Sequence, residues 1–175
     1  DIALGDLVIT TGAVRLEATT SYFVHDGYPA VADYVAVAAL VEAAHRLGHT
    51  AHLGITATAP GFYGAQGREL ERLPIRFPDL AQEMARQGVL NFEMEASALL
   101  VLAGLAGCRA GVVCTAYAQR VQGEFIHGAQ AERAEADVVE TGLEALSLLA
   151  GMDEAVRAEG VLHWRPSLGV PIVAS

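Results

Sequence analysis

Apolar residues along this chain fall into two kinds of segment, short β-branched runs and longer stretches with helical spacing. The short runs predict buried strands at Leu7–Thr11, continued by Ala13–Leu16, then at His52–Ala59 and at Ala110–Ala118. The longer stretches predict helices over Pro29–Leu47, Pro78–Arg86, Glu93–Ala106 and about Ala129–Leu149. Gly48 and Gly107 stand where two of these helices are expected to end. The alternation of strand and helix predicts an α/β layer structure in which some strands pair in parallel.

Composition narrows the class of protein. The chain has 175 residues, of which 53% are hydrophobic, a size and composition suited to one packed globular domain. Its net charge of −10 argues against a general affinity for nucleic acid or for an anionic membrane surface, since both need a basic face. No stretch is apolar for long enough to predict a membrane span. Cys108 and Cys114 are six residues apart, without metal or redox spacing, and are interpreted as small core residues in a reducing cytosol.

The segment 91–100, Asn-Phe-Glu-Met-Glu-Ala-Ser-Ala-Leu-Leu, places two carboxylates on either side of Met94 at the entrance of a predicted apolar helix. Acids in a first turn stabilise a helix through its dipole by about 0.3–1 kcal/mol. The same pair could instead bind a ligand rich in hydroxyl groups. Glu95 can accept hydrogen bonds from two vicinal hydroxyls, as in a ribose, and Met94 can form an apolar wall behind the sugar.

Two further groups are expected at the same edge of the sheet, because ligands of open α/β sheets bind beyond the carboxyl ends of strands. The loop after His52–Ala59 contains Phe62, Gln66 and Arg68, and Arg120 follows the third predicted strand. The Gln66 amide matches the donor and acceptor edge of a pyrimidine, Arg68 adds donors for a carbonyl oxygen, and Phe62 can lie against a ring.

Each of these residues also has a purely structural interpretation. Gln66 and Arg68 could be solvated loop residues, Phe62 could fill the edge of a core, and Arg120 could form a salt bridge at a strand end. Glu93 and Glu95 could merely cap a helix. Only their expected meeting at one edge of the sheet favours a nucleoside site.

Three motifs carry a resemblance to a known family. The segments Phe62-Tyr63-x-x-Gln66-x-Arg68, Asn91-Phe92-Glu93-Met94-Glu95 and Arg109-Ala110-Gly111-Val112-Val113 with Arg120 resemble signature segments of the uridine phosphorylases in the nucleoside phosphorylase family. The segments 5–16, 28–33 and 39–44 are similar to the same family. The resemblance covers most of the chain from Asp1 to about Leu149. It implies a three-layer α/β/α phosphorylase-type fold with a mixed central sheet, incomplete in this chain.

The resemblance also implies roles for the candidate residues. Gln66 and Arg68 would bind the uracil with Phe62 stacked nearby. Glu95 would hold the 2′ and 3′ hydroxyls of the ribose. The remaining residues implied in substrate binding are Glu93 and Met94 beside the sugar and Tyr117, Ala118 and Arg120 near the base. Of all these residues, Arg68 and Glu95 are expected to be catalytic.

The reaction implied is phosphorolysis of uridine to uracil and ribose 1-phosphate by a pentosyltransferase of pyrimidine salvage. Inorganic phosphate would be the co-substrate, with no cofactor and no metal. The purine branch of the family has an Asp in the segment that corresponds to Thr115-Ala116-Tyr117, where this chain has no acid, so a pyrimidine is favoured. The alternatives are a non-catalytic or nicked protein that only binds nucleosides, and a nucleosidase that uses water.

Family members bind phosphate through residues upstream of the segment that matches Asp1–Asp6, so the phosphate site is not expected in this chain. We expect the chain to be a fragment whose partner is a companion N-terminal fragment, or to form a homo-oligomer, in this family a homohexamer. Its small-molecule ligands would be a nucleoside and phosphate, and its location the cytoplasm. Residues 1–150 are expected to form the phosphorylase-like domain, and 151–175 an extension within it or a tail on its surface.

Overall fold

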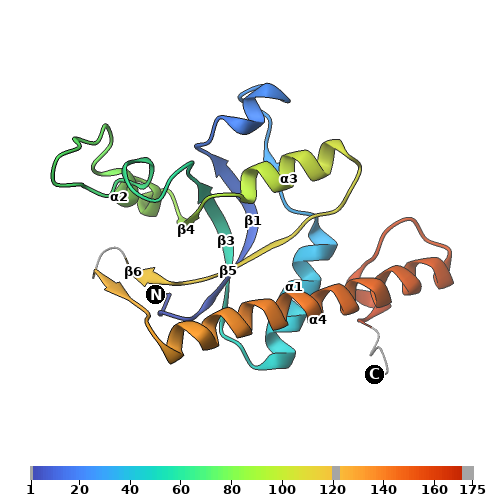
Figure 1. Ribbon diagram of the computed structural model, residues 1–175. Helices are drawn as coiled ribbons and strands as arrows, with labels where there is room; N and C mark the ends of the chain where they lie inside the picture. The colour runs from blue at the N-terminus through green and yellow to red at the C-terminus, as the bar shows by residue number, and fades with distance from the viewer. Residues whose placement is uncertain (1, 120–122, 171–175) are drawn as a thin grey trace.

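A mixed five-stranded sheet lies at the centre of the computed structural model, which describes residues 2–119 and 123–170 (Figure 1). Its strands are β1 (Leu7–Arg15), β2 (Ala30–Val31), β3 (Ala51–Thr58), β4 (Val89–Glu93) and β5 (Val112–Thr115). β3 pairs in parallel with both β1 and β4, whereas β2 and β5 pair antiparallel with β1. The predicted α/β fold with partly parallel pairing is confirmed.

A β-bulge interrupts the central strand. Thr10 pairs with Gly54 and Gly12 with Ile55, so Thr11 has no partner on β3. One extra residue in a strand reverses the face to which the later side chains point. Leu7 and Ile9 therefore face the same side of the sheet as residues 12 and 14, whereas Ala13 shares the opposite side with Thr10.

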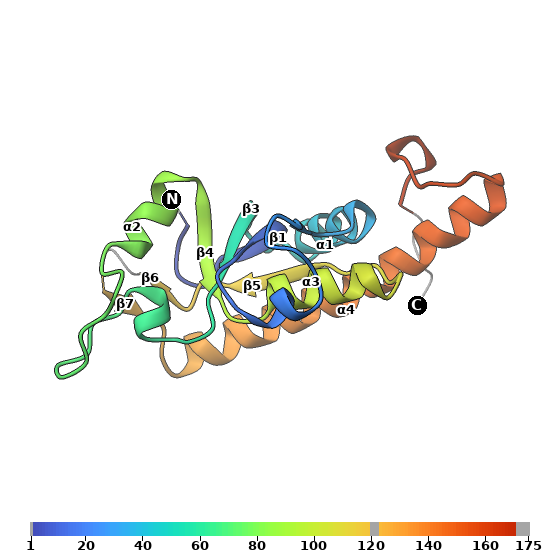
Figure 2. The same ribbon diagram turned by 90° about the horizontal axis from the view of Figure 1, so that it is seen from above.

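Helices cover both faces of the sheet. Leu7 and Ile9 pack against α1 (Tyr34–Leu47) and the long α4 (Ala129–Glu159), which cross each other in the main core. On the opposite face, Ala13 and Val112 pack with residues of α3 (Ala96–Leu105) in a second cluster. Because side chains alternate along strands, these two clusters define the three layers of an α/β/α fold. Figure 2 shows α4 running along much of the length of the molecule.

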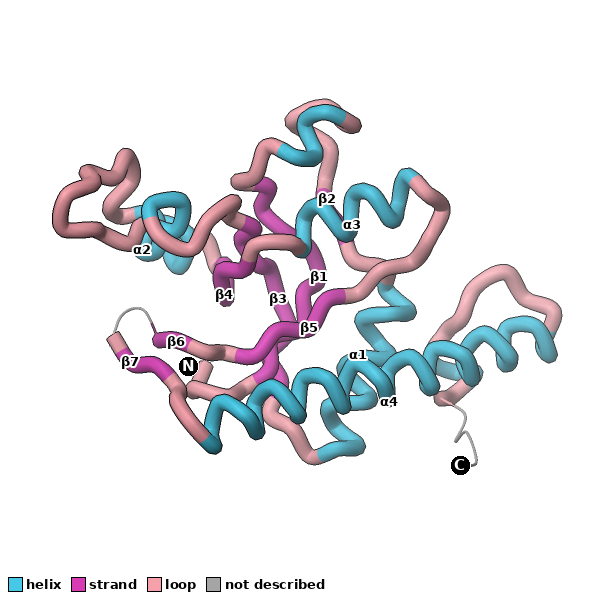
Figure 3. Tube along the Cα trace, in the orientation of Figure 1, coloured by secondary structure: helices cyan, strands magenta, loops and turns pink. Residues whose placement is uncertain are grey.

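Shorter elements surround this frame (Figure 3). They are η1 (Thr19–Tyr22), η2 (Gly64–Gln66), α2 (Leu80–Arg86), the small hairpin β6 (Ala118–Gln119) and β7 (Glu124–Phe125), and η3 (Pro166–Leu168). The hairpin lies near the start of the chain, since the Gln119 amide donates to the Ile2 carbonyl. No helix in the described part of the chain is both long and apolar enough to cross a membrane.

Several predicted boundaries shift in the structure. The helix expected from Pro29 begins at Tyr34, because Asp33 caps it by accepting hydrogen bonds from the amides of residues 35 and 36, and β2 occupies the preceding residues. The strand expected over Ala110–Ala118 is shorter, and α4 continues ten residues beyond Leu149, to Glu159. α4 therefore runs through position 150, where the sequence placed a boundary.

The prediction of a helix starting at Glu93 is wrong. Asn91–Glu93 are the end of β4, a strand that was not predicted, and α3 begins only at Ala96. The hydrogen bond of Thr58 on β3 with Glu93 on β4 ties the acid to the sheet. The two carboxylates thus occupy a strand-to-helix connection and not a first helical turn.

Candidate active site

A cavity of about 540 Å³ runs along β4 and lies within the size range of small-ligand sites. Its floor is β4 and the following turn, from Val89 to Glu95. α2 and the loop between β3 and α2 form one wall, and the segment 115–119 forms another. Three segments that are distant in sequence therefore meet around one space.

Eight of the nine residues predicted to bind substrate line this cavity: Phe62, Gln66, Arg68, Glu93, Met94, Glu95, Tyr117 and Ala118. The ninth, Arg120, lies outside the described residues. The sequence placed these groups at one edge of the sheet, and the structure brings eight of them together. Their roles toward a substrate remain predictions.

Two aromatic rings flank the guanidinium of Arg68 in the wall of the cavity. The guanidinium carbon of Arg68 lies 3.8 Å from the centre of the Phe62 ring and 5.3 Å from that of Phe125. Such stacking holds a planar guanidinium in place. Gln66 is only 3% exposed and lines the same cavity, so its amide is also held within the wall.

The Arg68 Nε is buried and has no hydrogen-bond partner among the described residues. Burial lowers the pKa of this guanidinium from its usual value. A buried donor without an acceptor costs about 1–3 kcal/mol. Because Arg68 lines the cavity, its guanidinium is a candidate donor to an acceptor such as a carbonyl oxygen or a developing anion.

Both carboxylate oxygens of Glu93 are hydrogen-bonded within the protein. One carboxylate oxygen accepts from the Thr58 hydroxyl, and the other accepts from the amides of Glu95 and Ala96 at 2.6 and 2.5 Å. These amides belong to the turn that starts α3, whose first donors need acceptors. Glu93 thus links the sheet to the helix and fixes the turn that carries Glu95.

Glu95 is the carboxylate that is left for a ligand. Its side chain is exposed at the cavity and makes no hydrogen bond or ion pair with another described residue. Met94 lies beside it and is 41% exposed, which leaves its thioether available as an apolar surface. The turn therefore offers one free acceptor and one apolar group, while Glu93 positions both.

Two series of hydrogen-bonded polar side chains lie behind the cavity and were not predicted from the sequence. Thr10 hydrogen-bonds Thr56 at 2.7 Å, and Thr56 donates to Asn91 at 2.7 Å, which joins β1, β3 and β4. Thr58, besides its bond to Glu93, accepts from the Ser97 amide. Period-two spacing places Asn91 on the face of Glu93, so it would have been found if β4 had been predicted.

Cys114 on β5 lies close to these groups. Burial and the negative charge of Glu93 raise the pKa of Cys114 to about 11, although a hydrogen bond with Asn91 opposes the rise. A thiol with so high a pKa is protonated at neutral pH and is a poor nucleophile. Cys114 therefore packs beside the cavity, as expected from the sequence, whereas the same expectation is wrong for Cys108, which is exposed.

Tyr117 reaches from the cavity wall to α4. Its hydroxyl donates to the Glu135 carboxylate at 2.5 Å, an interaction that raises the pKa of the phenol. Next to it, Ala118 pairs with Phe125 in the β6–β7 hairpin. This wall is tied to the start of α4, and its side chains offer the cavity mainly apolar surface.

Known proteins resemble this chain over most of its length. The profile of the family described as "Phosphorylase superfamily" matches residues 1–156. A uridine phosphorylase from Thermococcus kodakarensis is 44% identical over 171 residues, which cover 95% of this chain and 59% of that protein. A uridine phosphorylase from Klebsiella aerogenes is 37% identical over 147 residues, covering 82% of this chain and 58% of the relative.

A guanosine phosphorylase from Halorubrum lacusprofundi is 32% identical over 130 residues, covering 74% of this chain and 47% of that protein. The relatives from Thermococcus and Klebsiella are named for uridine, whereas the one from Halorubrum is named for guanosine. The chain spans just under three fifths of the length of the two uridine phosphorylases.

Proposed function

Because the chain belongs to the phosphorylase superfamily, we propose that it forms the nucleoside-binding part of an enzyme that cleaves uridine with inorganic phosphate. The products are uracil and ribose 1-phosphate, which makes the enzyme a pentosyltransferase of nucleoside salvage. Arg68 carries this proposal, because it lines the same cavity as Gln66 and Glu95. The uridine phosphorylases among its relatives support the choice of uridine.

The roles that we propose are those that the family resemblance implies, and the contacts within the site support them. Gln66 and Arg68 bind the uracil, and Phe62 supports both the guanidinium and the base. Glu95 accepts from the ribose hydroxyls, and Met94 packs behind the sugar. Glu93 acts through the turn and is a positioning residue, because both of its oxygens are already bonded. Tyr117 and Ala118 complete the apolar wall.

Catalysis depends on charge that develops as the glycosidic bond breaks. The sugar gains positive character and the departing uracil gains negative charge, which the fixed donors of Arg68 and Gln66 stabilise more strongly than the neutral base. Phosphate attacks the anomeric carbon from the opposite side. Glu95 holds the ribose in place for this attack. The scheme requires no cofactor and no metal in the reaction.

Phosphate needs positive charge that the described cavity does not supply. Among the described residues that line it, Arg68 is the one Lys or Arg, and it is assigned to the base. We therefore place the phosphate-binding groups outside these 175 residues, on a companion segment or a neighbouring subunit. The apolar side chains of Leu53 and Ile55 on β3 are 54% and 43% exposed and give such a partner a surface to cover.

A homohexamer is the assembly that we propose for the whole protein. The two free cysteines and the acidic composition are compatible with the cytoplasm as its location. We assign residues 1–150 to the phosphorylase-like domain, with 151–175 as an extension of it. Tyr34 on α1 donates to the Trp164 carbonyl at 2.8 Å, which supports packing of the extension on this domain.

The decisive experiment measures loss of uridine, with and without phosphate, by the whole protein. Phosphate-dependent release of uracil supports the proposal, whereas release without phosphate identifies a nucleosidase. Uridine binding without turnover in either condition indicates a non-catalytic binding protein. Either of these last two outcomes overturns phosphorolysis.

Two variants test the site. Arg68→Ala is expected to lower kcat/KM for uridine about 10²–10³-fold, because it removes a donor to the developing charge. Arg72→Ala, in the same loop but away from this cavity, is the matched control. Glu95→Ala is expected to lower activity with uridine more than with 2′-deoxyuridine, which already lacks one hydroxyl. Equal losses on both substrates would leave Glu95 with only a packing role.

A further inference from the structure

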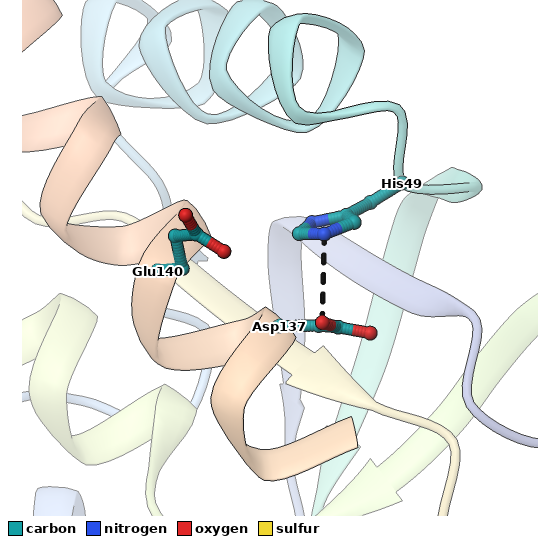
Figure 4. A group of neighbouring side chains, drawn as sticks. All are labelled: His49, Asp137 and Glu140. Carbon is teal, nitrogen blue, oxygen red and sulfur yellow. Dashed lines mark ion pairs between the residues drawn. The ribbon is translucent and has the colours of Figure 1, made fainter. Parts of the chain in front are cut away.

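A second cluster of chemically active side chains lies where the end of α1 meets α4, away from the cavity (Figure 4). His49 follows the C-terminus of α1, and Asp137 and Glu140 are three residues apart on α4. Residues at this spacing lie on one face of a helix. One ligand atom from each of the three side chains lies within 4.8 Å of the others.

The backbone of His49 is fixed by the helix end. Gly48 adopts the left-handed conformation, with φ of +75°, and the His49 amide donates to the Ala44 carbonyl at 2.9 Å. This bond and the left-handed glycine are features of a Schellman-type helix end. The imidazole therefore leaves α1 in a defined direction, toward α4.

A buried hydroxyl fixes the tautomer of His49. Thr141 is fully buried, and its Oγ1 lies 2.7 Å from the Asp137 carbonyl and 2.9 Å from the His49 Nδ1. The hydroxyl has one proton, which it donates to the carbonyl, so it must accept from Nδ1–H. Nε2 of a neutral His49 is consequently left with a lone pair.

A carboxylate oxygen lies near this nitrogen. The His49 Nε2 and the Asp137 Oδ1 are 3.6 Å apart, which is longer than a hydrogen bond. A cation about 2.1 Å from both atoms would sit between them at an angle of roughly 120°, near the tetrahedral value. The Glu140 carboxylate is exposed and can turn to become a third ligand.

We propose that His49, Asp137 and Glu140 bind one Zn²⁺ ion. An imidazole nitrogen favours zinc over Mg²⁺ and Ca²⁺, which prefer oxygen ligands. Thr141 acts from behind by orienting the imidazole, as the outer partners of metal-bound histidines do. None of the four residues lines the cavity, so the ion is structural. It joins α4 to the α1–β3 corner and takes no part in the reaction.

A second histidine–carboxylate pair serves as the control. His52 Nε2 lies 2.8 Å from Asp6 Oδ2, a direct hydrogen bond that leaves no room for an ion between the two atoms. This pair has a side-chain chemistry similar to that of His49 and Asp137. It differs in the separation of its atoms and in the lack of a third ligand among the described residues.

The test is calorimetric titration of ZnCl₂ into the chelator-treated full chain, in a Cys108→Ser background that removes the exposed thiol. We expect one ion per chain. His49→Gln and Asp137→Asn should each weaken binding at least about tenfold, and Thr141→Val about 10–100-fold. His52→Gln should leave it unchanged. Since Glu140 is exposed, Glu140→Gln keeps the fold and should also weaken binding.

Zinc should raise the Tm of the parent chain but not that of His49→Gln, because a ligand stabilises only the state that binds it. Absence of saturable binding overturns the proposal and leaves His49 and Asp137 as a simple ion pair. Binding that survives both His49→Gln and Glu140→Gln also overturns it. Both readouts are independent of uridine cleavage, so the outcome is separate from that of the proposed function.

Discussion

The two cysteines differ in their surroundings in a way that predicts their reactivity. Cys108 is exposed after α3, whereas the pKa of Cys114 is raised to about 11 by burial and by Glu93. At pH 8 about one Cys114 thiol in a thousand is ionised, and only the thiolate reacts. We expect Ellman's reagent to modify one thiol rapidly, and Cys108→Ser to remove this fast phase. Two thiols of equal rate in the folded chain would contradict the pKa assigned to Cys114.

The hydrogen bonds of Glu17 let us predict how the free energy of unfolding changes as the pH falls. Burial alone would raise the pKa of Glu17, but hydrogen bonds from Thr20 and Ser97 outweigh it, so that the pKa is lowered from 4.5. A carboxyl with a lowered folded-state pKa stabilises the fold above the unfolded pKa. It loses this contribution as the pH falls below about 4.5 and through the folded value.

We therefore expect Glu17→Gln to destabilise the chain at pH 7 and to have progressively less effect as the pH falls below 4.5. Urea unfolding of both proteins at a series of pH values measures the difference in free energy. Glu154→Gln, on the exposed side of α4, is the control. A constant difference across the acid range would show that the Glu17 hydrogen bonds do not depend on its charge.

At the scale of elements, two glycines predict opposite effects of the same substitution. Gly48 ends α1 with φ of +75°, so a side chain there is strained, and Gly48→Ala should cost about 1–2 kcal/mol. Gly104 is inside α3, and an added methyl group meets nothing within 4 Å, so Gly104→Ala should stabilise by about 0.5–1 kcal/mol. Thermal or urea unfolding distinguishes the signs. Stabilisation by Gly48→Ala would refute the assigned helix end.

The elements also show why sequence reasoning succeeded in some places and failed in others. β1, β3 and α1 were predictable because their apolar periodicity is continuous. β4 was not, because Asn91 and Glu93 on its cavity face are polar and interrupt the pattern expected for a buried strand. The two-residue β2 exists only through its pairing with β1, which local sequence does not encode.

The candidate site was also predictable only in part. The motifs indicated Gln66, Arg68 and Glu95, since their side-chain chemistry is evident in the sequence. The resemblance implied that Glu95 holds the ribose with Glu93 beside it, but the bond that ties Glu93 to Thr58 was not predictable, because it joins two strands that are distant in sequence. Distinct roles for two acids two residues apart follow from tertiary contacts.

At the scale of the whole molecule, the main core extends beyond position 150. Met152 has no exposed surface and packs in the cluster that contains Leu148 of α4 and Ile9 of β1. We expect Met152→Ala to destabilise the entire chain by about 2–5 kcal/mol, as large core truncations do. Leu146→Ala, at a residue that is 64% exposed on the same helix, should change stability by about 0.5 kcal/mol or less.

Unfolding followed by both near-UV and far-UV circular dichroism measures these differences. Coincident transitions in Met152→Ala would show that the end of α4 unfolds with the sheet. Loss of helix without loss of stability in the remainder would place residue 152 outside the cooperative unit.

The bulge at Thr11 has a consequence for any attempt to transplant β1 between relatives. Odd-numbered residues before the bulge and even-numbered residues after it face the same layer. Whether a residue number is odd or even therefore does not say which layer its side chain enters. Deleting Thr11 would remove the bulge and leave Ala13 in the layer of α3, because Gly12 would then follow Thr10 directly and still pair with Ile55. A β1 segment from a relative without the bulge must therefore be joined according to its pairing with β3, and not by counting residues.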